Sequence, residues 1–180
     1  HPWERRRHRI SELAYMASQT VRDVIWTFNP DKAQFEHLAE YLFSYAESAF
    51  TGSVVRLEFK EDRQGSRGED YPSKLKYELL LMTKGIVSNV LRHAEATRFW
   101  MRVGRSEDGG LTIEFGDDGR GFDPGAVSGS DGISGLIRRA EAMGATLRLE
   151  SRPGEGARYY LSVGRAALKM DSKADTESSG

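Results

Sequence analysis

The chain has 180 residues, which is enough for one domain and an appendage. Hydrophobic residues make up 38% and charged residues 29%, so a core can form beneath a well-solvated surface. The net charge of −1 gives no global attraction to nucleic acid or membranes, and the absence of cysteine excludes disulfides and thiolate metal sites. No apolar run is long enough to cross a bilayer and no signal peptide is visible, which is compatible with a cytoplasmic location.

The N-terminal segment, residues 4 to 28, is predicted to form one long helix. Apolar side chains recur there every three or four positions, at Ile10, Leu13, Ala17, Val21, Val24 and Phe28. This seam is typical of a bundle or coiled coil, although a helix that packs on its own domain would show the same pattern. Pro30 is expected to end the helix, because proline restrains the residue before it. The basic start, residues 5 to 9, is interpreted as a solvated helix end rather than a nucleic-acid contact.

Residues 31 to 165 alternate between helical and strand patterns. Helices are expected over 35–50, 77–94 and 136–143, and strands over 54–59, 98–103, 111–115, 146–150 and 157–163. Residues 60–72 are polar and predict a loop, 107–110 predict a hairpin turn, and Gly144 is expected to cap the third helix. The pattern predicts an α/β fold, a two-layer sandwich with helices on one face of a mixed sheet. The tail from about Ala166 is rich in Lys, Asp, Ser and Glu, and disorder is expected there.

The end of the predicted strand 111–115 carries the most informative motif. Asp117 lies two residues after this strand, and Gly119 and Gly121 give the backbone freedom to turn or to approach a flat ligand closely. The Asp117 carboxylate can accept a hydrogen bond from a base-like amino group. A polar turn between strand and loop would have the same sequence, so the motif alone leaves both interpretations open.

Polar features on both sides of this turn favour a ligand site. Asn89, Arg92 and His93 share one edge of the preceding helix. A polar loop with three glycines leads into the following helix at Leu136, and these are Gly129, Gly132 and Gly135. A glycine-rich loop at a helix N-terminus favours an anion such as phosphate. The combination predicts a nucleotide site.

These motifs occur in an order that resembles a known family. The ordered set is Asn89 with Arg92-His93-Ala94, Asp117-Asp118-Gly119-Arg120-Gly121-Phe122-Asp123, Gly132-x-x-Gly135-Leu136, Arg139-Ala140-Glu141-Ala142-Met143-Gly144 and Pro153-Gly154-Glu155-Gly156. Over roughly residues 30 to 165 the chain resembles the catalytic ATP-binding domain of two-component sensor histidine kinases, in the nitrate-sensor-like branch with a short ATP lid. The wider superfamily includes gyrase, the heat-shock chaperone ATPase and mismatch-repair ATPases. The resemblance implies a Bergerat-type ATP-binding fold with ATP and Mg²⁺ as its cofactors.

The resemblance implies a role for each residue at the base end of the site. Asp117 would accept a hydrogen bond from the adenine amino group, and the alternative is that it only caps the turn. Gly119 and Gly121 would give the adenine room.

At the phosphate end, Asn89 would hold the Mg²⁺ that bridges the phosphates, an oxygen-ligand role that suits a hard cation. Arg92 and His93 would face the phosphates or the ribose, although a structural hydrogen bond explains His93 almost equally well. The lid and the phosphate cradle would consist of Gly132, Gly135 and Leu136.

Two positions depart from the family pattern. Gly85 stands where this branch usually has Glu, and other branches Asn, to help hold the metal or polarise the attacking group. A glycine there supplies no such group, and in a helix it costs about 1 kcal/mol against alanine. Ala157 stands where Gly-x-Gly-Thr is usual, and the lost hydroxyl is expected to matter less. The chain is therefore either an active kinase domain or a nucleotide-binding pseudo-kinase module that serves dimerisation or scaffolding.

The resemblance also divides the chain into regions. Residues 1–30 resemble the end of the second dimerisation helix, 31–165 the ATP-binding catalytic domain, and 166–180 are the expected disordered tail. The expected partners are ATP, a response regulator and, in the full-length protein, a second copy joined through the N-terminal helix, without nucleic acid. A Ser/Thr kinase of the anti-sigma-factor type shares the fold, but the N-terminal helix argues against it.

The histidine that accepts the phosphoryl group is not expected within this sequence. In the family an acidic residue follows that histidine, whereas Arg9 follows His8 here, and His37 and His93 lie in other contexts. The acceptor helix is therefore expected upstream, and this chain alone is not expected to autophosphorylate.

Overall fold

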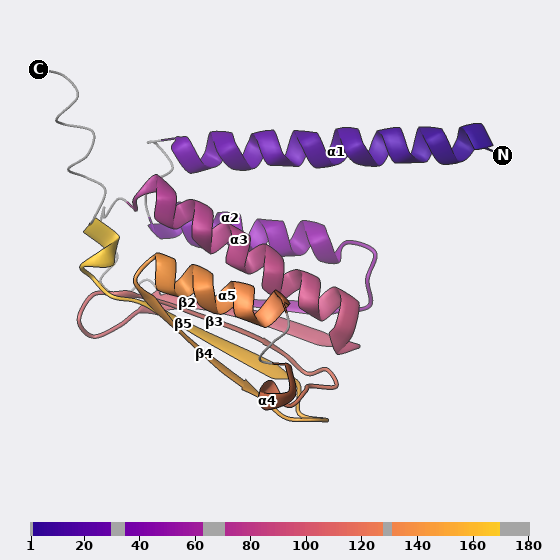
Figure 1. Ribbon diagram of the computed structural model, residues 1–180. Helices are drawn as coiled ribbons and strands as arrows, with labels where there is room; N and C mark the ends of the chain where they lie inside the picture. The colour runs from indigo at the N-terminus through magenta and orange to yellow at the C-terminus, as the bar shows by residue number, and fades with distance from the viewer. Residues whose placement is uncertain (1, 30–34, 63–70, 128–130, 170–180) are drawn as a thin grey trace, which may run out of the picture.

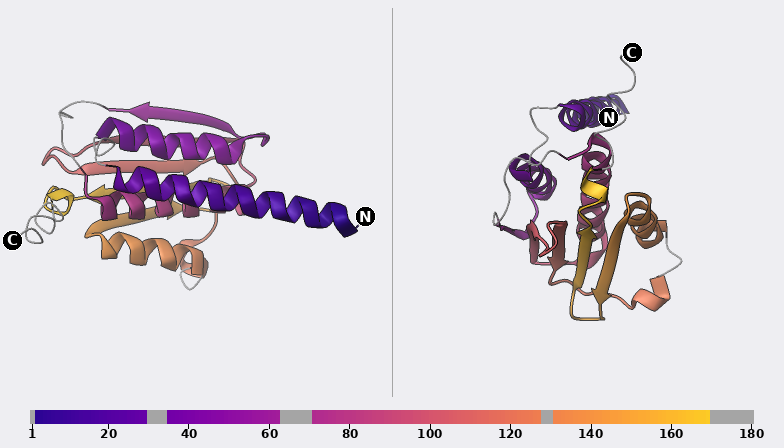
Figure 2. Two further views of the ribbon diagram at one scale, coloured as in Figure 1. Left: turned by 90° about the horizontal axis from the view of Figure 1, so that it is seen from above. Right: turned by 90° about the vertical axis from the view of Figure 1, so that its left-hand side faces the viewer.

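The computed structural model describes residues 2–29, 35–62, 71–127 and 131–169, and every structural statement below concerns these residues. Helices α2 (Phe35–Phe50), α3 (Ser73–Asn89) and α5 (Asp131–Ala142) cover one face of a five-stranded mixed sheet (Figure 1). Helix α1 (Pro2–Phe28) lies over α2 and α3, and its N-terminal half extends beyond them (Figures 1 and 2). The predicted α/β sandwich is confirmed. None of the helices in the described ranges is long and apolar enough to cross a membrane.

The sheet has the strand order β1-β2-β3-β5-β4. Its strands are β1 (Arg56–Glu61), β2 (Arg98–Arg105), β3 (Leu111–Asp117), β4 (Ala145–Ser151) and β5 (Ala157–Val163). Strand β1 pairs parallel to β2, and all other pairs are antiparallel. Strand β3 is therefore central, and its last residue, Asp117, is flanked by Phe99 on β2 and Ala157 on β5.

The core lies between the sheet and the three covering helices. Alternation along β3 and β5 turns every second side chain towards the helices, so Phe115 and Tyr159 are buried. The apolar stripe of α3 meets them with Leu79, Leu80, Met82 and Ile86. Each large apolar side chain buried in this way stabilises the fold by about 1.5–3 kcal/mol.

The C-terminal half of α1 is held on the domain by a mixed polar and aromatic contact. Asp23 is only 6% exposed, forms an ion pair with Lys84 of α3 and accepts a hydrogen bond from the Tyr41 hydroxyl (2.8 Å). The rings of Trp26 and Tyr41 stack with centroids 3.9 Å apart. The buried Lys76 ammonium donates to the carbonyl oxygens of Trp26 and Asn29, so it caps the end of α1.

The opposite side of α1 is apolar and exposed. The exposed large side chains on it are Leu13, Val21, Val24, Ile25 and Phe28. The predicted seam residues whose side chains are described therefore face away from the core. Helix α1 combines both interpretations of its sequence, because one side packs on the domain and the other leaves an apolar seam open.

The boundaries of several elements differ from those predicted, and strand β1 includes Lys60 and Glu61 of the predicted loop. Helix α3 begins directly after Pro72, and its continuation over Val90–Ala94 is a π-helical turn, η2. Helix α5 begins at Asp131, so Gly132 and Gly135 lie inside a helix rather than in the predicted loop. The reason is the apolar stripe, which extends back to the buried Ile133 and draws the first turn onto the core.

Other parts of the prediction concern the connections and the C-terminus. A short helix that was not predicted, α4 (Pro124–Val127), follows β3, and Gly144 caps α5 with a φ of +64°, as expected. Beyond β5 the chain forms a 3₁₀ turn over Ala167–Lys169, and Leu168 is buried as part of the core. The predicted stop at Pro30, residues 63–70 of the predicted loop, Gly129 and the tail from residue 170 lie outside the described residues.

The turn after β3 is clamped between η2 and the β4–β5 hairpin. The Arg120 N–H donates to the Ala94 carbonyl (2.7 Å), and the Gly154 N–H donates to the Arg120 carbonyl (2.6 Å). A Cβ on Gly119 would lie 2.2 Å from the Ala94 oxygen. Gly121 has a φ of +59°, and a Cβ there would lie 2.0 Å from the carbonyl oxygen of Arg152. Only glycine permits this backbone path.

Replacement of Gly121 by alanine is expected to be far more costly than the same change at Gly52. Gly52 also has a positive φ, +80°, but has open space around its Cβ position. Gly52→Ala should therefore lower the free energy of unfolding by only about 1–2 kcal/mol, which is the cost of the left-handed conformation for a residue with a Cβ. Gly121→Ala adds overlap with a backbone oxygen and should lower the free energy of unfolding, measured with denaturant, by more than about 4 kcal/mol. Equal losses at the two positions would contradict the clamped turn.

Candidate functional site

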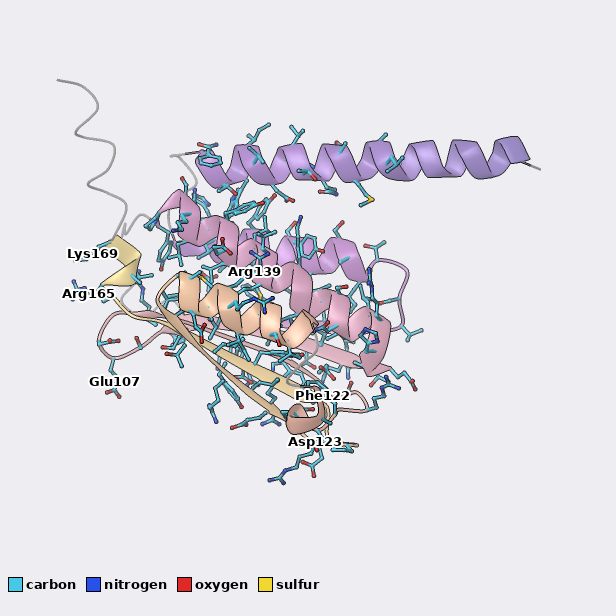
Figure 3. The ribbon with its side chains drawn as sticks, in the orientation of Figure 1. Glu107, Phe122, Asp123, Arg139, Arg165 and Lys169 are labelled. Atoms are coloured by element: carbon cyan, nitrogen blue, oxygen red, sulfur yellow. The ribbon has the colours of Figure 1, made fainter. Side chains whose placement is uncertain are left out.

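A cavity of about 350 Å³ opens beside the end of β3. It is lined by Asn89, Val90, His93 and Ala94 from α3 and η2, Asp117, Arg120, Gly121 and Phe122 from β3 and its turn, Gly132 and Ile133 from α5, and Ala157 and Tyr159 from β5. Figure 3 shows Phe122 and Asp123 beside α4, at the opposite end of the sheet from Arg165 and Lys169. The cavity is thus built where the central strand, two helices and the neighbouring strand meet.

Five of the predicted site residues line this cavity, namely Asn89, His93, Asp117, Gly121 and Gly132. The other four predicted residues do not line it, namely Arg92, Gly119, Gly135 and Leu136. Gly119 lies behind Asp117 and donates its N–H to the Asp117 Oδ1 atom (2.9 Å). Leu136 is buried against α3, and Arg92 is exposed on η2.

The π-helical turn explains why His93 and Arg92 separate. In a π-helix the turn is wider than in an α-helix, so residues four apart stay on one side while residues three apart diverge. Asn89 and His93 therefore both reach the cavity, whereas Arg92 turns away from it. The turn ends at Glu95, which has a φ of +54°. A π-helical turn of this kind is often found at a functional site.

The Asp117 carboxylate is buried, with 3% of the residue exposed. Burial raises the pKa of Asp117, the N–H groups of Gly119 and Ala157 oppose this by donating to the carboxylate, and the charge of Asp118 adds to it. The carboxylate keeps acceptor capacity towards the cavity beyond these two backbone donors. It is therefore suited to receive a hydrogen bond from a ligand.

The neighbouring carboxylate of Asp118 has a different role. It accepts hydrogen bonds from the Thr97 N–H (2.8 Å), the Thr97 hydroxyl (2.7 Å) and the Arg98 N–H (2.7 Å). These bonds lower the pKa of Asp118, despite the desolvation that opposes them. Asp118 thus ties the turn to the start of β2 and does not line the cavity.

At the other end of the cavity, Asn89 and Tyr159 line the wall from α3 and β5. Burial raises the pKa of Tyr159 to about 12, the side chain of Asn89 opposes this in part, and the charge of Asp117 raises it further. The carboxamide oxygen of Asn89 lies 3.6 Å from the position that a Cβ on Gly132 would occupy. Polar groups of α3, β5 and the first turn of α5 therefore meet here.

Gly85, one helical turn before Asn89, faces α5. A Cβ on Gly85 would lie 3.1 Å from the Leu136 Cδ2 atom. The leucine side chain covers the place where a glutamate or asparagine was expected, so this glycine allows α5 to pack closely on α3.

One protein oxygen in the cavity suits a hard cation. The Asn89 carboxamide can supply a single ligand, and among the described side chains no three acidic or histidine groups gather into a metal site. Mg²⁺ commonly keeps several waters and binds through one or two protein oxygens together with substrate phosphates. The residues present fit a metal that a ligand's phosphates share with Asn89, and they do not form a separate cage.

The sequence interpretation missed the apolar walls and the floor of the cavity. The missed lining residues are Val90, Ala94, Arg120, Phe122, Ile133, Ala157 and Tyr159. Most occupy apolar positions in a helix or strand pattern, where a side chain that contacts a ligand looks the same as one that fills the core. Ala94, Arg120 and Phe122 had a signal because they belong to the ordered motifs, and Ala157 had one because it departs from the expected motif.

Comparison with known proteins identifies the family of the chain. Residues 76–166 match the family model described as "Histidine kinase-, DNA gyrase B-, and HSP90-like ATPase". An uncharacterized sensor-like histidine kinase of Chloroflexus aurantiacus is 34% identical over 166 residues, which are 86% of this chain and 27% of that protein. The chain spans less than a third of the length of the curated relatives it matches.

Solved structures share the fold. The histidine kinase domain of the blue-light activated histidine kinase of Erythrobacter litoralis EL346 aligns with a TM-score of 0.58 and 19% identity, over 73% of this chain and 66% of that chain. The ATP binding domain of PrrB from Mycobacterium tuberculosis aligns with a TM-score of 0.54 and 22% identity, over 69% of this chain and 91% of that chain. The family model covers about half of the residues and includes both ends of the cavity, and the chain therefore belongs to the family of histidine kinase-, DNA gyrase B- and HSP90-like ATPases.

Proposed function

We propose that this chain is the ATP-binding catalytic domain of a sensor histidine kinase. In the full-length protein it would transfer the γ-phosphoryl group of ATP to a histidine on a separate helix, for relay to a response regulator. The observation that carries this proposal is the buried Asp117 carboxylate, which faces a cavity of about 350 Å³ with unused acceptor capacity. The family match and the sensor-kinase relative support it. Membership of the nitrate-sensor-like branch and a cytoplasmic location belong to the same proposal.

The base end of the cavity has the chemistry that adenine requires. Its walls include Val90, Ala94, Phe122 and Ile133, which offer apolar surface to a flat ring. Asp117 would accept a hydrogen bond from the adenine amino group, with Gly121 beside it in the turn. An ionised carboxylate accepts hydrogen bonds and cannot donate them. It would therefore favour adenine, which has an amino group at that position, over a base with a carbonyl there.

The phosphate end combines neutral donors with one metal ligand. Gly132 lies in the first turn of α5, where free N–H groups and the helix dipole favour an anion. Asn89 would contribute its oxygen to Mg²⁺, which would neutralise phosphate charge when bound, and His93 would lie near the phosphates or the ribose. Phosphoryl transfer depends mainly on positioning and charge neutralisation, so these residues can serve it without a covalent nucleophile of their own.

A second function, that of a nucleotide-binding pseudo-kinase module for dimerisation or scaffolding, is favoured by Gly85. The site lacks the side chain that the family places one turn before Asn89, and Leu136 fills that space. Both functions require nucleotide binding, and they differ only in turnover.

We also propose that α1 joins two copies of the protein. Its apolar seam stays exposed over the residues from Leu13 to Phe28, while Asp23 and Trp26 hold the other side on the domain. A parallel helix from a second copy would bury that seam.

The first test replaces Asp117 by asparagine. An amide NH₂ would then replace one carboxylate oxygen, and it could not accept the hydrogen bond from the adenine amino group. Binding of Mg-ATP measured by calorimetry should therefore weaken at least tenfold, which corresponds to about 1.4 kcal/mol. The control is Asp118→Asn, which should leave binding within about twofold, because Asp118 does not line the cavity. Unchanged binding in Asp117→Asn would contradict the assignment of the base end.

The same pair of variants should respond oppositely to pH. The pKa of Asp117 is raised in the folded protein, so its stabilising effect is present at low pH and is lost as pH rises through that pKa. Asp117→Asn should therefore be at least as stable as the parent at pH 7, with a gain that shrinks as pH falls. The pKa of Asp118 is lowered, so Asp118→Asn should lose stability at pH 7 and lose less below pH 4. Denaturant unfolding across pH measures both.

Phosphorylation of the full-length protein separates the two functions. If Gly85 has abolished turnover, Gly85→Glu should restore phosphoryl transfer to the acceptor histidine. Gly85→Gln is the matched control, because it displaces Leu136 equally but carries no charge. Phosphoryl transfer by the parent at the same rate as by Gly85→Glu would rule out the pseudo-kinase function.

Sedimentation velocity over a range of concentrations tests the dimer. The chain should self-associate, and Val21→Lys combined with Ile25→Lys should weaken association at least tenfold, because both side chains lie on the exposed seam. A lysine at the exposed polar position Thr20 is the control. A monomer at every concentration would contradict the proposal.

A further inference from the structure

We propose that Arg120 is a further binding residue of the nucleotide site, and that its guanidinium group leaves an ion pair with Glu95 to stack on the base. This inference rests on the proposed function, because it concerns the base end of the same cavity. The resemblance gives roles to Asp117, Gly119 and Gly121 of the glycine-rich turn, and Arg120 lies between the two glycines.

Arg120 brings a permanent positive charge to the cavity. Among the described residues that line the cavity, it is the only lysine or arginine. Its N–H group is bound to Ala94, and Phe122 follows two residues later; both are walls of the base end, which also contains Asp117. Arg92, which was expected to face the ligand, does not line the cavity. The permanent cation that a ligand meets in the described part of the cavity therefore lies at the base end.

The backbone of Arg120 is fixed, whereas its side chain is free to change conformation. The N–H group donates to the Ala94 carbonyl (2.7 Å), and the carbonyl accepts from the Gly154 N–H (2.6 Å). On either side, a Cβ on Gly119 or Gly121 would lie 2.2 or 2.0 Å from a backbone oxygen, so the turn is closely packed. The Arg120 side chain itself is 61% exposed. Any movement towards a ligand is therefore a rotation of this side chain on a fixed backbone.

The present partner of Arg120 is held weakly. Its Nη1 atom lies 3.6 Å from the Oε1 atom of Glu95, whose side chain is 80% exposed. An exposed pair of this kind contributes little, because water solvates both charges and two long side chains lose freedom to keep one geometry. Exchange of this ion pair for a contact with a ligand therefore costs little free energy.

The backbone of Glu95 indicates that its side chain is used. Glu95 has a φ of +54°, and no other described residue except glycine has a positive φ. Glycine would adopt this conformation without strain, and strained residues of this kind cluster at ligand sites. Glu95 directly follows η2, the turn that brings His93 to the cavity. Its strained conformation thus places a carboxylate where it can hold and release Arg120.

The chemistry of the guanidinium group favours the base as its second partner. The group is flat, weakly hydrated and stacks on aromatic faces. The same contact occurs on the face of the sheet that the helices leave open, where the Arg148 guanidinium lies 4.2 Å from the centre of the Tyr160 ring. Asp117 and Arg120 are three residues apart on one turn. The carboxylate recognises the edge of the base, and the guanidinium covers its face.

The test compares ligands that share the base and differ in phosphate. Adenosine, ADP and ATP are titrated in EDTA into the parent chain and Arg120→Ala, and binding is followed by the NMR chemical shifts of the backbone amides. All three affinities should fall by the same factor, about fivefold, because the lost contact is to the base. A loss that grows from adenosine to ATP would indicate a phosphate contact, and a loss below twofold would indicate no contact. Either result overturns the inference.

The matched control is Arg152→Ala. Arg152 is an exposed arginine of the neighbouring hairpin, pairs with Glu155 and does not line the cavity. Its replacement removes the same charge from the same end of the sheet and should leave all three affinities within about twofold. A loss equal to that of Arg120→Ala would show a general effect of charge and overturn the inference.

Two further replacements separate the flat shape of the guanidinium from its charge. Arg120→Tyr keeps a flat group that can stack on a base, so it should bind adenosine within about twofold of the parent. Arg120→Lys keeps the charge without the flat group and should bind adenosine less tightly than Arg120→Tyr does. The reverse order would contradict stacking.

Glu95→Gln tests the exchange of partners, because it removes the charge that Arg120 must leave. Adenosine should then bind about two- to fivefold more tightly. The gain should disappear when Arg120→Ala is also present. An unchanged or lower affinity in Glu95→Gln, or the same gain in both backgrounds, would contradict the exchange.

The outcome also distinguishes this inference from the proposed function. A parent chain that binds neither adenosine nor ATP, in EDTA or in Mg²⁺, refutes the proposed function. A parent chain that binds all three ligands, with the same affinities in Arg120→Ala, keeps the nucleotide site and overturns the role of Arg120.

Discussion

A negative charge buried at the end of the central strand is the constraint on which the site depends. The Asp117 carboxylate is removed from water, so the backbone must bring donors to it from Gly119 and Ala157. One donor requires the chain to turn back within two residues, and the other requires β5 to run beside β3. The turn, the hairpin and η2 therefore pack against one another at a single point. The ionised carboxylate reduces stability, and this cost is typical of a group kept for binding.

The helices and strands could be predicted because each depends on a local spacing of apolar residues. Alternation identified β3 and β5, and the helical stripes identified α2 and α3, so the sandwich and the Asp117 position were both accessible. The π-helical turn was not, because it depends on how Ala94 packs against the turn after β3. The start of α5 was missed because its glycines are typical of a loop, whereas the burial of Ile133 stabilises a helix there. The cavity walls were missed because apolar contact with a ligand leaves no periodic signal.

The surroundings of Asn89 depend on a glycine one helical turn earlier. Gly85 gives up a side chain on α3, and the space is used for close packing of Leu136. Tyr159 lines the same cavity as Asn89 and Asp117, and the charge of Asp117 contributes to the raised pKa of Tyr159. The packing of α5 on α3 and the burial of Asp117 thus shape one cavity from two sides.

The ion pair between Asp23 and Lys84 has a consequence for how this sequence can diverge. Lys84 directly precedes Gly85 on the helix that carries Asn89, and Asp23 belongs to α1. Loss of either partner leaves a charge and the Tyr41 hydroxyl at a largely buried contact, which is costlier than loss of both. Positions 23, 41 and 84 are therefore expected to change together among homologues. The N-terminal helix α1 and the nucleotide-site helix α3 are therefore expected to coevolve.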